Sequence, residues 1–202
     1  MIKSREDLKE YIKRDLISAG AYPLSLKKKI IAAFQPTVWK YTILMRKMEY
    51  LNNCKRKNAI QNAIFFLAYS RYKRIGMKYG YTIPINVFGP GLCLAHIGTI
   101  VVNGNAKIGK NARIHVGVTI GNSSPQGSNH VDDNVPVIGD NVYIGPGAVI
   151  YGKIHIGNSV RIGANSVVNK DVPDNVTVAG APAKIVSYHG SDHVVEKGEI
   201  HV

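Results

Sequence analysis

Histidine is the residue type in this chain best suited to acid–base chemistry at neutral pH, because its ordinary pKa is about 6.5. The 202-residue sequence contains seven histidines. His96 and His115 lie in a repetitive stretch, whereas His130 lies close to Asp132 and Asp133 in a polar stretch. These five residues are the first candidates for a general base and the groups around it.

The other potential metal ligands do not form a recognisable site. His189, His193 and His201 near the end of the chain lack metal-ligand spacing with other donors, so we expect no metal. The two cysteines, Cys54 and Cys93, do not suggest a disulfide framework and favour a reducing, cytoplasmic setting. The charged start of the chain lacks a signal-peptide pattern, and the longest apolar stretch, residues 63–69, is too short to span a bilayer.

An aliphatic side chain recurs every sixth residue from Phe88 to about Val168, a period that fits neither a helix nor a flat strand. We place two extra residues around positions 102–107. The period predicts a coil with three six-residue faces per turn, hence a β-helix and a mainly β fold. A sandwich with Gly-rich turns is the alternative, but it has no reason to keep one period. Three inward columns are expected: Phe88, Ile108, Ile138 and Ile156; Leu94, Ile114, Ile144 and Ile162; and Ile100, Ile120, Ile150 and Val168.

This coil model places both repeat histidines on the outside. His96 lies two residues after the inward Leu94, and we expect it to share an outward column with Val116, Pro146 and Ala164. His115 follows Ile114 and lies about one coil away. An outward histidine above small residues can reach a hydroxyl group, whereas a surface corner or a subunit contact is the structural alternative for each.

The first 80 residues differ from the rest in charge and pattern. They hold 18 basic and 5 acidic side chains, a net charge of +13, and the remaining 122 residues are neutral. Ser4, followed by Glu6 and Asp7, predicts a helix start, and Gly20 and Pro23 predict its end. Further helices are expected at about residues 25–36, 37–51 and 58–77. One side of the last helix is apolar: Ile60, Ile64, Phe65, Ala68, Tyr72 and Ile75.

The basic helical segment leaves several partners open. It could be a solvated face, it could bind a membrane surface carrying anionic lipid, or it could form an oligomer contact. Nucleic acid is the least favoured partner, because no recognised binding motif accompanies the charge.

The six-residue period stops between Ile120 and Ile138, where the sequence is GNSSPQGSNHVDDNVPV. Polar and turn-forming residues inserted between two coils predict a loop, residues 121–137, extruded from a corner. A solvated loop is the plain alternative to an acceptor site here.

Four motifs carry a family resemblance: GPGLCLAHIGTIVVN at 89–103, AKIGKNARIHVGVTIG at 106–121, IGDNVYIGPGAVIYG at 138–152 and AGAPAKIV at 179–186. They resemble the serine acetyltransferase branch of the left-handed β-helix acyltransferases, and within it the bacterial capsule, exopolysaccharide and O-antigen acetyltransferases. The resemblance implies a basic helical segment (1–80), a left-handed parallel β-helix (81–186) and a C-terminal tail (187–202).

The resemblance also implies a chemistry and an assembly. His96 matches the family's catalytic histidine, acetyl-CoA is the donor, and three clefts form between the subunits of a homotrimer. In related enzymes the extruded loop shapes the acceptor pocket, which makes His130, Asp132 and Asp133 acceptor-binding candidates. His115, outward and about one coil from His96, could also bind the acceptor or complete a histidine pair. The residues that match the family's CoA groove are Gly145, Pro146, Ala164, Asn169, Lys170 and Lys184.

Three positions depart from the serine enzymes. Tyr81 stands where an aspartate orients the histidine, Val135 precedes the loop-ending Pro136 in place of a histidine, and the chain ends in Val202 rather than isoleucine. We therefore expect acetylation of a sugar hydroxyl on a polysaccharide precursor by a cytoplasmic protein, peripheral to the membrane if the basic helices bind lipid. The alternatives are serine O-acetyltransferase and a non-enzymatic trimeric scaffold.

Overall fold

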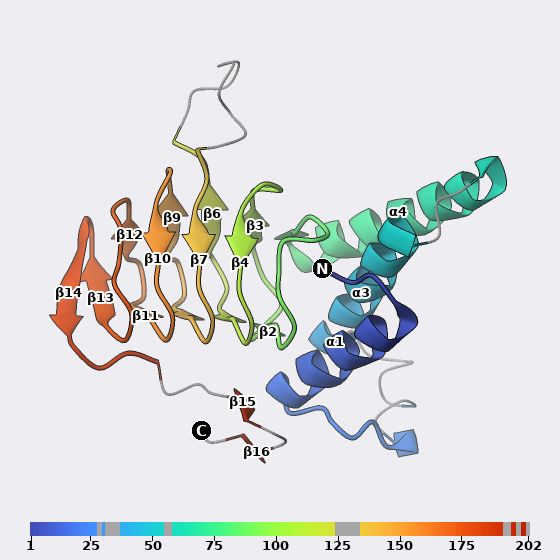
Figure 1. Cartoon of the computed structure of the whole chain (residues 1–202), viewed down its shortest axis with the longest axis horizontal. Helices are drawn as coiled ribbons and strands as arrows, with labels where there is room; N and C mark the ends of the chain where they lie inside the picture. The colour runs from blue at the N-terminus through green and yellow to red at the C-terminus, as the bar shows by residue number, and fades with distance from the viewer. Residues whose placement is uncertain are drawn as a thin grey trace.

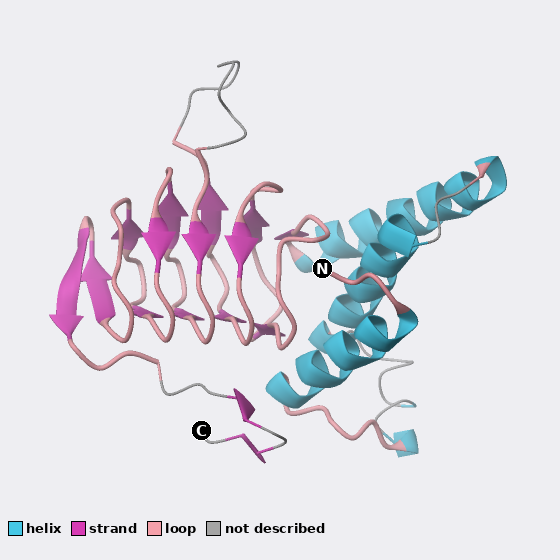
Figure 2. Cartoon of the chain, in the orientation of Figure 1, coloured by secondary structure: helices cyan, strands magenta, loops and turns pink. Residues whose placement is uncertain are grey.

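The computed structural model describes residues 1–27, 30, 37–54, 58–123, 134–191, 195–196 and 199–200. A bundle of helices packs against one end of a coil of short parallel strands (Figures 1 and 2). The helices are α1 (Arg5–Ser18), α3 (Val38–Cys54) and α4 (Ala59–Tyr79). None of the described helices is long and apolar enough to cross a membrane.

The helix ends follow from capping residues. The Ser4 side chain accepts from the Asp7 N–H at 3.0 Å, and the Asp7 carboxylate accepts from the Ser4 N–H at 3.1 Å, so α1 begins with a capping box. Asn58 caps α4, and Gly80 ends it with φ 80°. The predictions for these helices and for α3 are confirmed, whereas most of the helix expected at 25–36 lies outside the described residues.

Three parallel sheets form the faces of the coil. One face has the order β1-β3-β6-β9-β12, the second β10-β7-β4, and the third β13-β11-β8-β5-β2, with β14 added antiparallel. The strands are β1 (Tyr81–Thr82), β2 (Cys93–Leu94), β3 (Ile100–Val102), β4 (Lys107–Ile108), β5 (Arg113–Ile114), β6 (Thr119–Gly121), β7 (Val137–Ile138), β8 (Tyr143–Ile144), β9 (Val149–Tyr151), β10 (His155–Ile156), β11 (Arg161–Ile162), β12 (Val167–Val168), β13 (Thr177–Gly180) and β14 (Ala183–Ser187). A hairpin of β15 (Val195–Glu196) and β16 (Glu199–Ile200) follows and lies near α1 (Figure 1).

Two predicted inward columns are confirmed by the strand register. Leu94, Ile114, Ile144 and Ile162 pair in order, and so do Phe88, Ile108, Ile138 and Ile156. These side chains are at most 5% exposed, so each coil buries its aliphatic residues against the next coil.

The third column is wrong by two residues at its first member. Val102, not Ile100, pairs with Ile120, while Ile100 pairs with Tyr81. Both aliphatic residues are buried, so hydrophobicity alone does not distinguish the two registers. The two extra residues therefore lie between Leu94 and Val102, around His96, and not after Val102.

A buried ion cluster joins the helices to the first coil. Arg46 of α3 is fully buried and contacts Asp15 of α1 at 2.8 Å and Glu49 at 3.0 Å. Its guanidinium also donates to the carbonyls of Phe88 (2.9 Å) and Gly89 (2.6 Å). Burial opposes the positive charge, but the two carboxylates outweigh it and raise the Arg46 pKa.

The carboxylates of this cluster bind the β-helix backbone as well. Asp15 accepts from the N–H groups of Gly91 and Leu92 at 2.8 and 2.9 Å, and Glu49 accepts from the Asn86 N–H at 2.9 Å. Every member of the cluster is thus hydrogen-bonded to both structural parts of the chain.

A tyrosine cluster makes the second connection. The Tyr41 hydroxyl donates to the Tyr72 hydroxyl at 2.9 Å, which donates to the Ile83 carbonyl at 2.6 Å. The Tyr41 ring also packs on Tyr81, with centroids 4.9 Å apart. The apolar side predicted for α4 is only partly confirmed: Tyr72 is buried, but Ile60 and Ile64 are exposed because they lie beyond the surface that α3 and β1 cover.

We expect Arg46→Met to lower the free energy of unfolding by roughly 3–5 kcal/mol, because it leaves Asp15 and Glu49 buried without a counter-charge. Arg74→Met, on the exposed surface of α4, is the matched control and should change it by less than about 0.5 kcal/mol. Urea unfolding followed by circular dichroism measures both. Equal effects of the two substitutions would show that the cluster does not stabilise the fold.

Candidate functional site

The two extra residues widen the corner of the first coil at His96. The Ala95 N–H still donates to the Ile114 carbonyl at 2.9 Å, in register, but the chain then departs from the column. The Gly117 N–H donates to Thr99, and a Cβ on Gly98 would lie 3.2 Å from the Val116 Cβ. Gly98 and Thr99 therefore lie over Val116, and the prediction that His96 does so is wrong. His96 itself is exposed on the outside of this corner.

The structure brings His115 next to His96. Their ring centroids are 6.0 Å apart, and the His115 ring lies 5.1 Å from the ring of Tyr143 in the following coil. The His115 Nε2 atom is buried and has no hydrogen-bond partner among the described residues. The half-buried His115 ring thus keeps one polar atom without a protein partner, directly beside an exposed histidine.

Three effects lower the pKa of His115. Burial is the largest, followed by the positive charges of Arg113 and of protonated His96. His115 is therefore neutral at neutral pH, with one ring nitrogen that donates and one that accepts.

The family resemblance implies an orienting aspartate at the position that Tyr81 occupies. Its hydroxyl donates to the backbone carbonyl of His96 at 2.7 Å. Burial, together with the neighbouring Tyr41 and Tyr79, raises the pKa of this 3% exposed side chain, so the hydroxyl stays protonated and able to donate. Tyr81 fixes the main chain of His96, and no side chain in the described part of the molecule hydrogen-bonds the His96 imidazole.

The loop candidates His130, Asp132 and Asp133 lie outside the described residues. The two flanks of the loop are linked, because the Asn134 amide donates to the Ser123 hydroxyl at 2.8 Å. The loop leaves the coil after β6, and the His96 corner precedes β3 on the same face. Within one chain, the loop therefore begins where the parallel strands of this sheet end, whereas His96 lies where they begin.

The six residues matched to a CoA groove divide between two corners. Pro146 and Ala164 are exposed at the corner that follows β8 and β11, next to Val116. Lys184, also exposed, pairs in β14 with Ala179, close to the same edge. Asn169 and Lys170 lie at a different corner, the one that follows β6, β9 and β12. There the Asn169 amide donates to the Tyr151 hydroxyl at 3.3 Å.

The packing of adjacent coils explains the glycine at position 145 without any ligand. A Cβ at this position would lie 2.8 Å from both the Ala164 nitrogen and the Ile162 carbonyl oxygen. Close approach of adjacent coils thus requires glycine here.

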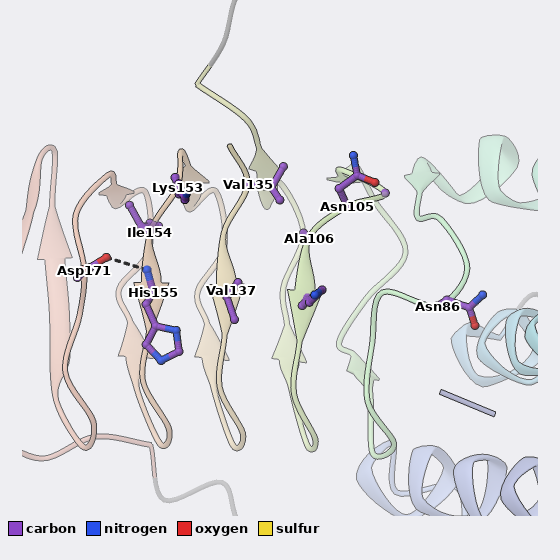
Figure 3. A pocket seen from close by; sticks show the side chains of 11 residues that line it. Asn86, Asn105, Ala106, Val135, Val137, Lys153, Ile154, His155 and Asp171 are labelled. Carbon is purple, nitrogen blue, oxygen red and sulfur yellow. Dashed lines mark hydrogen bonds between the residues drawn. The ribbon is translucent and has the colours of Figure 1, made fainter. Parts of the chain in front are cut away.

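A cleft of about 670 Å³ on the β4, β7 and β10 face was not predicted from the sequence. Figure 3 shows its labelled lining, in which Asp171 accepts from the His155 N–H at 2.8 Å. Lys107, Val137 and His155 each precede an inward isoleucine and pair across the strands, so the repeat alone places them in one outward row. The cleft is separate from the His96 corner and adds Lys153 to its basic lining.

Residues 136–170 match the family model described as bacterial transferase hexapeptide (six repeats). The chain is 35% identical over 123 residues to serine acetyltransferase 4 of Arabidopsis thaliana, which covers 60% of this chain and 34% of that protein. The chain therefore spans about a third of the length of this plant relative.

Similar solved structures extend over most of the chain. A serine acetyltransferase of Neisseria gonorrhoeae in complex with serine is 29% identical, with a TM-score of 0.66, and covers 91% of this chain and 71% of its own. A serine acetyltransferase of Brucella abortus in complex with coenzyme A is 26% identical, with a TM-score of 0.67, and covers 93% and 70%.

The repeat is that of the hexapeptide-repeat transferases, and the fold is a left-handed parallel β-helix with N-terminal helices. More narrowly, the fold is serine acetyltransferase-like. The comparisons favour the serine alternative over the predicted polysaccharide acceptor, since the plant relative and both bacterial structures are serine acetyltransferases.

We expect the His115 ring to titrate below the ordinary histidine range, because burial and Arg113 disfavour its charged form. NMR titration of the ring protons measures this, with His115→Gln to assign the signal. Because the folded state disfavours the protonated ring, acidification through the His115 titration should lower the free energy of unfolding. His115→Gln should make this decrease smaller. A midpoint at or above the ordinary value would contradict the burial of the neutral ring.

Proposed function

We propose that the protein is an acetyl-CoA-dependent O-acetyltransferase that acts on the hydroxyl of L-serine. The observation that carries the proposal is the exposed His96 at a widened corner, 6.0 Å from His115, in a serine acetyltransferase-like fold. Similarity to one structure bound to serine and to another bound to coenzyme A supports the choice of acceptor and donor.

In this proposal His96 is the general base. It takes the proton from the acceptor hydroxyl as that oxygen attacks the thioester carbonyl carbon. The tetrahedral intermediate then collapses, the bond from carbon to sulfur breaks, and the imidazolium returns the proton to the departing CoA thiolate. The products are the O-acetyl ester and free CoA.

Transfer is direct, without an acetyl-enzyme. Cys93 is the cysteine nearest to the site in sequence, but it is buried, and burial raises the pKa of its thiol. A thiolate nucleophile is therefore disfavoured at neutral pH. His96 has no described hydroxyl or thiol partner that it could activate as a nucleophile.

The acceptor would contact several side chains. The ring of neutral, half-buried His115 can hydrogen-bond a polar group of the acceptor once a rotation of the side chain exposes Nε2. Asp132 and Asp133 supply negative charge that suits the ammonium group of serine, and His130 lies in the same loop. Within one chain, the loop and His96 lie at opposite ends of the parallel strands. We therefore propose that the loop of a neighbouring subunit in a homotrimer completes the pocket.

The donor would lie along the edge formed by Gly145, Pro146 and Ala164, where small residues leave room for the pantetheine arm. Lys184 lies near this edge and can act as a point charge for the nucleotide phosphates. We propose that Asn169 and Lys170, at the other corner, contact the donor held by the adjacent subunit.

Removing the base tests the function directly. We expect His96→Ala to lower kcat for CoA release from acetyl-CoA and L-serine by about 10²–10⁴-fold, which is the usual contribution of a positioned base. His189→Ala, which changes an exposed histidine in the C-terminal tail, is the matched control and should leave kcat unchanged.

The same assay includes a panel of sugars and oligosaccharides. Turnover that depends on His96 with a sugar but not with serine would overturn the acceptor while keeping the chemistry. Absence of turnover with every acceptor, equal for the wild type and His96→Ala, would support a non-enzymatic scaffold.

Tyr81→Phe separates a positioning role from a structural one. We expect kcat to fall roughly fivefold with KM for acetyl-CoA unchanged, because a buried hydrogen bond contributes about 1 kcal/mol and 1.36 kcal/mol corresponds to tenfold in rate. Tyr79→Phe removes a hydroxyl from the same aromatic cluster and is the control. A lower Tm with unchanged kcat would assign Tyr81 to stability alone.

A further inference from the structure

Helix α4 presents an apolar stripe to solvent. Ile60, Ile64 and Leu67 follow the i, i+4, i+7 spacing that places side chains on one helix face. They are 74%, 54% and 71% exposed, and the adjacent Phe66 is 69% exposed. Burial of such side chains against a partner is favourable, so a stripe of this size marks an interaction surface.

The charges on the same helix are all positive. From Ala59 to Tyr79 the sequence has no acidic residue and has Arg71, Lys73, Arg74 and Lys78, all of them exposed. Arg71 and Arg74 continue the face of the apolar stripe by one and two turns. The sequence KRK at positions 55–57 immediately precedes the helix. Basic residues thus lie on both sides of the apolar turns, in the preceding KRK sequence and at the following Arg71 and Arg74.

The helix is also accessible from outside. Its last turns pack against α3 and β1, while its first turns extend away from the β-helix (Figure 1). Residues 60–67 span about 10 Å along the helix axis at 1.5 Å per residue, so the apolar stripe covers two turns of this free end.

We infer that the stripe Ile60, Ile64 and Leu67 docks on the surface of a bilayer that contains anionic phospholipid. The apolar side chains enter the boundary between head groups and acyl chains, and the basic residues contact the lipid phosphates. A second copy of the chain fits less well as the occupant, because two α4 helices would bring cationic side chains together without a carboxylate on either helix.

Vesicle sedimentation of the full-length protein tests this. We expect binding to vesicles of equimolar phosphatidylcholine and phosphatidylglycerol, and at least tenfold weaker binding to phosphatidylcholine alone. High salt should weaken the binding, because the charges are exposed. The variant Ile64→Asn with Leu67→Asn should bind at least tenfold more weakly. Arg71→Gln with Arg74→Gln should lose about thirtyfold, since each basic side chain contributes a factor of about five.

Tyr188→Ser combined with Lys153→Gln removes an exposed apolar and an exposed basic side chain elsewhere and should bind like the wild type. Equal binding to both kinds of vesicle, or unchanged binding of the α4 variants, would overturn the inference. Light scattering provides the last outcome: a lower assembly mass for Ile64→Asn with Leu67→Asn would show that a second copy, not lipid, occupies the stripe. CoA release from acetyl-CoA and L-serine is measured in parallel, so that loss of vesicle binding is distinguished from loss of the proposed activity.

Discussion

The buried contact of Arg46 with Asp15 and Glu49 is the interaction on which the rest of the structure depends. The two carboxylates neutralise a guanidinium that is fully removed from water. The cluster also hydrogen-bonds the backbone of the open first coil: the guanidinium donates to the carbonyls of Phe88 and Gly89, and the carboxylates accept from backbone N–H groups. A β-helix exposes unpaired backbone at its end, and here the helices supply the missing partners. Breaking one member would leave both structural parts unsatisfied.

The same docking shapes the candidate site. Where α4 ends, the Tyr79 and Gly80 carbonyls accept from the N–H groups of Gly98 and Ile100, at 3.1 and 3.0 Å. The widened corner around His96 is therefore built partly on a helix end and not only on the coil beneath it. This explains how two extra residues are accommodated without disturbing Leu94 or Val102, both of which remain buried and paired.

The repeat was predictable because each inward aliphatic residue contacts its equivalent in the next coil, so a local pattern determines the packing. The register around His96 was not predictable in the same way, since Ile100 and Val102 are both aliphatic and both buried, and β1 before the repeat selects between them. Nor did sequence indicate the Arg46 cluster: charged residues are rarely buried, and apart from Glu49 the partners of Arg46 are 31 to 43 positions away. The pairing of His96 with His115 followed from spacing, whereas the unpartnered Nε2 atom required coordinates.

In the proposed mechanism, Tyr81 at the position of an orienting carboxylate changes what holds His96 in place. A carboxylate would hydrogen-bond the imidazole and select its tautomer. The Tyr81 hydroxyl instead binds the carbonyl of the same residue, and no described side chain hydrogen-bonds the ring nitrogens. The ring orientation must then come from groups that arrive with the ligand or from the neighbouring neutral His115. In the proposed mechanism, acceptor binding and alignment of His96 are then one event, so the side chains around His115 can influence kcat as well as affinity.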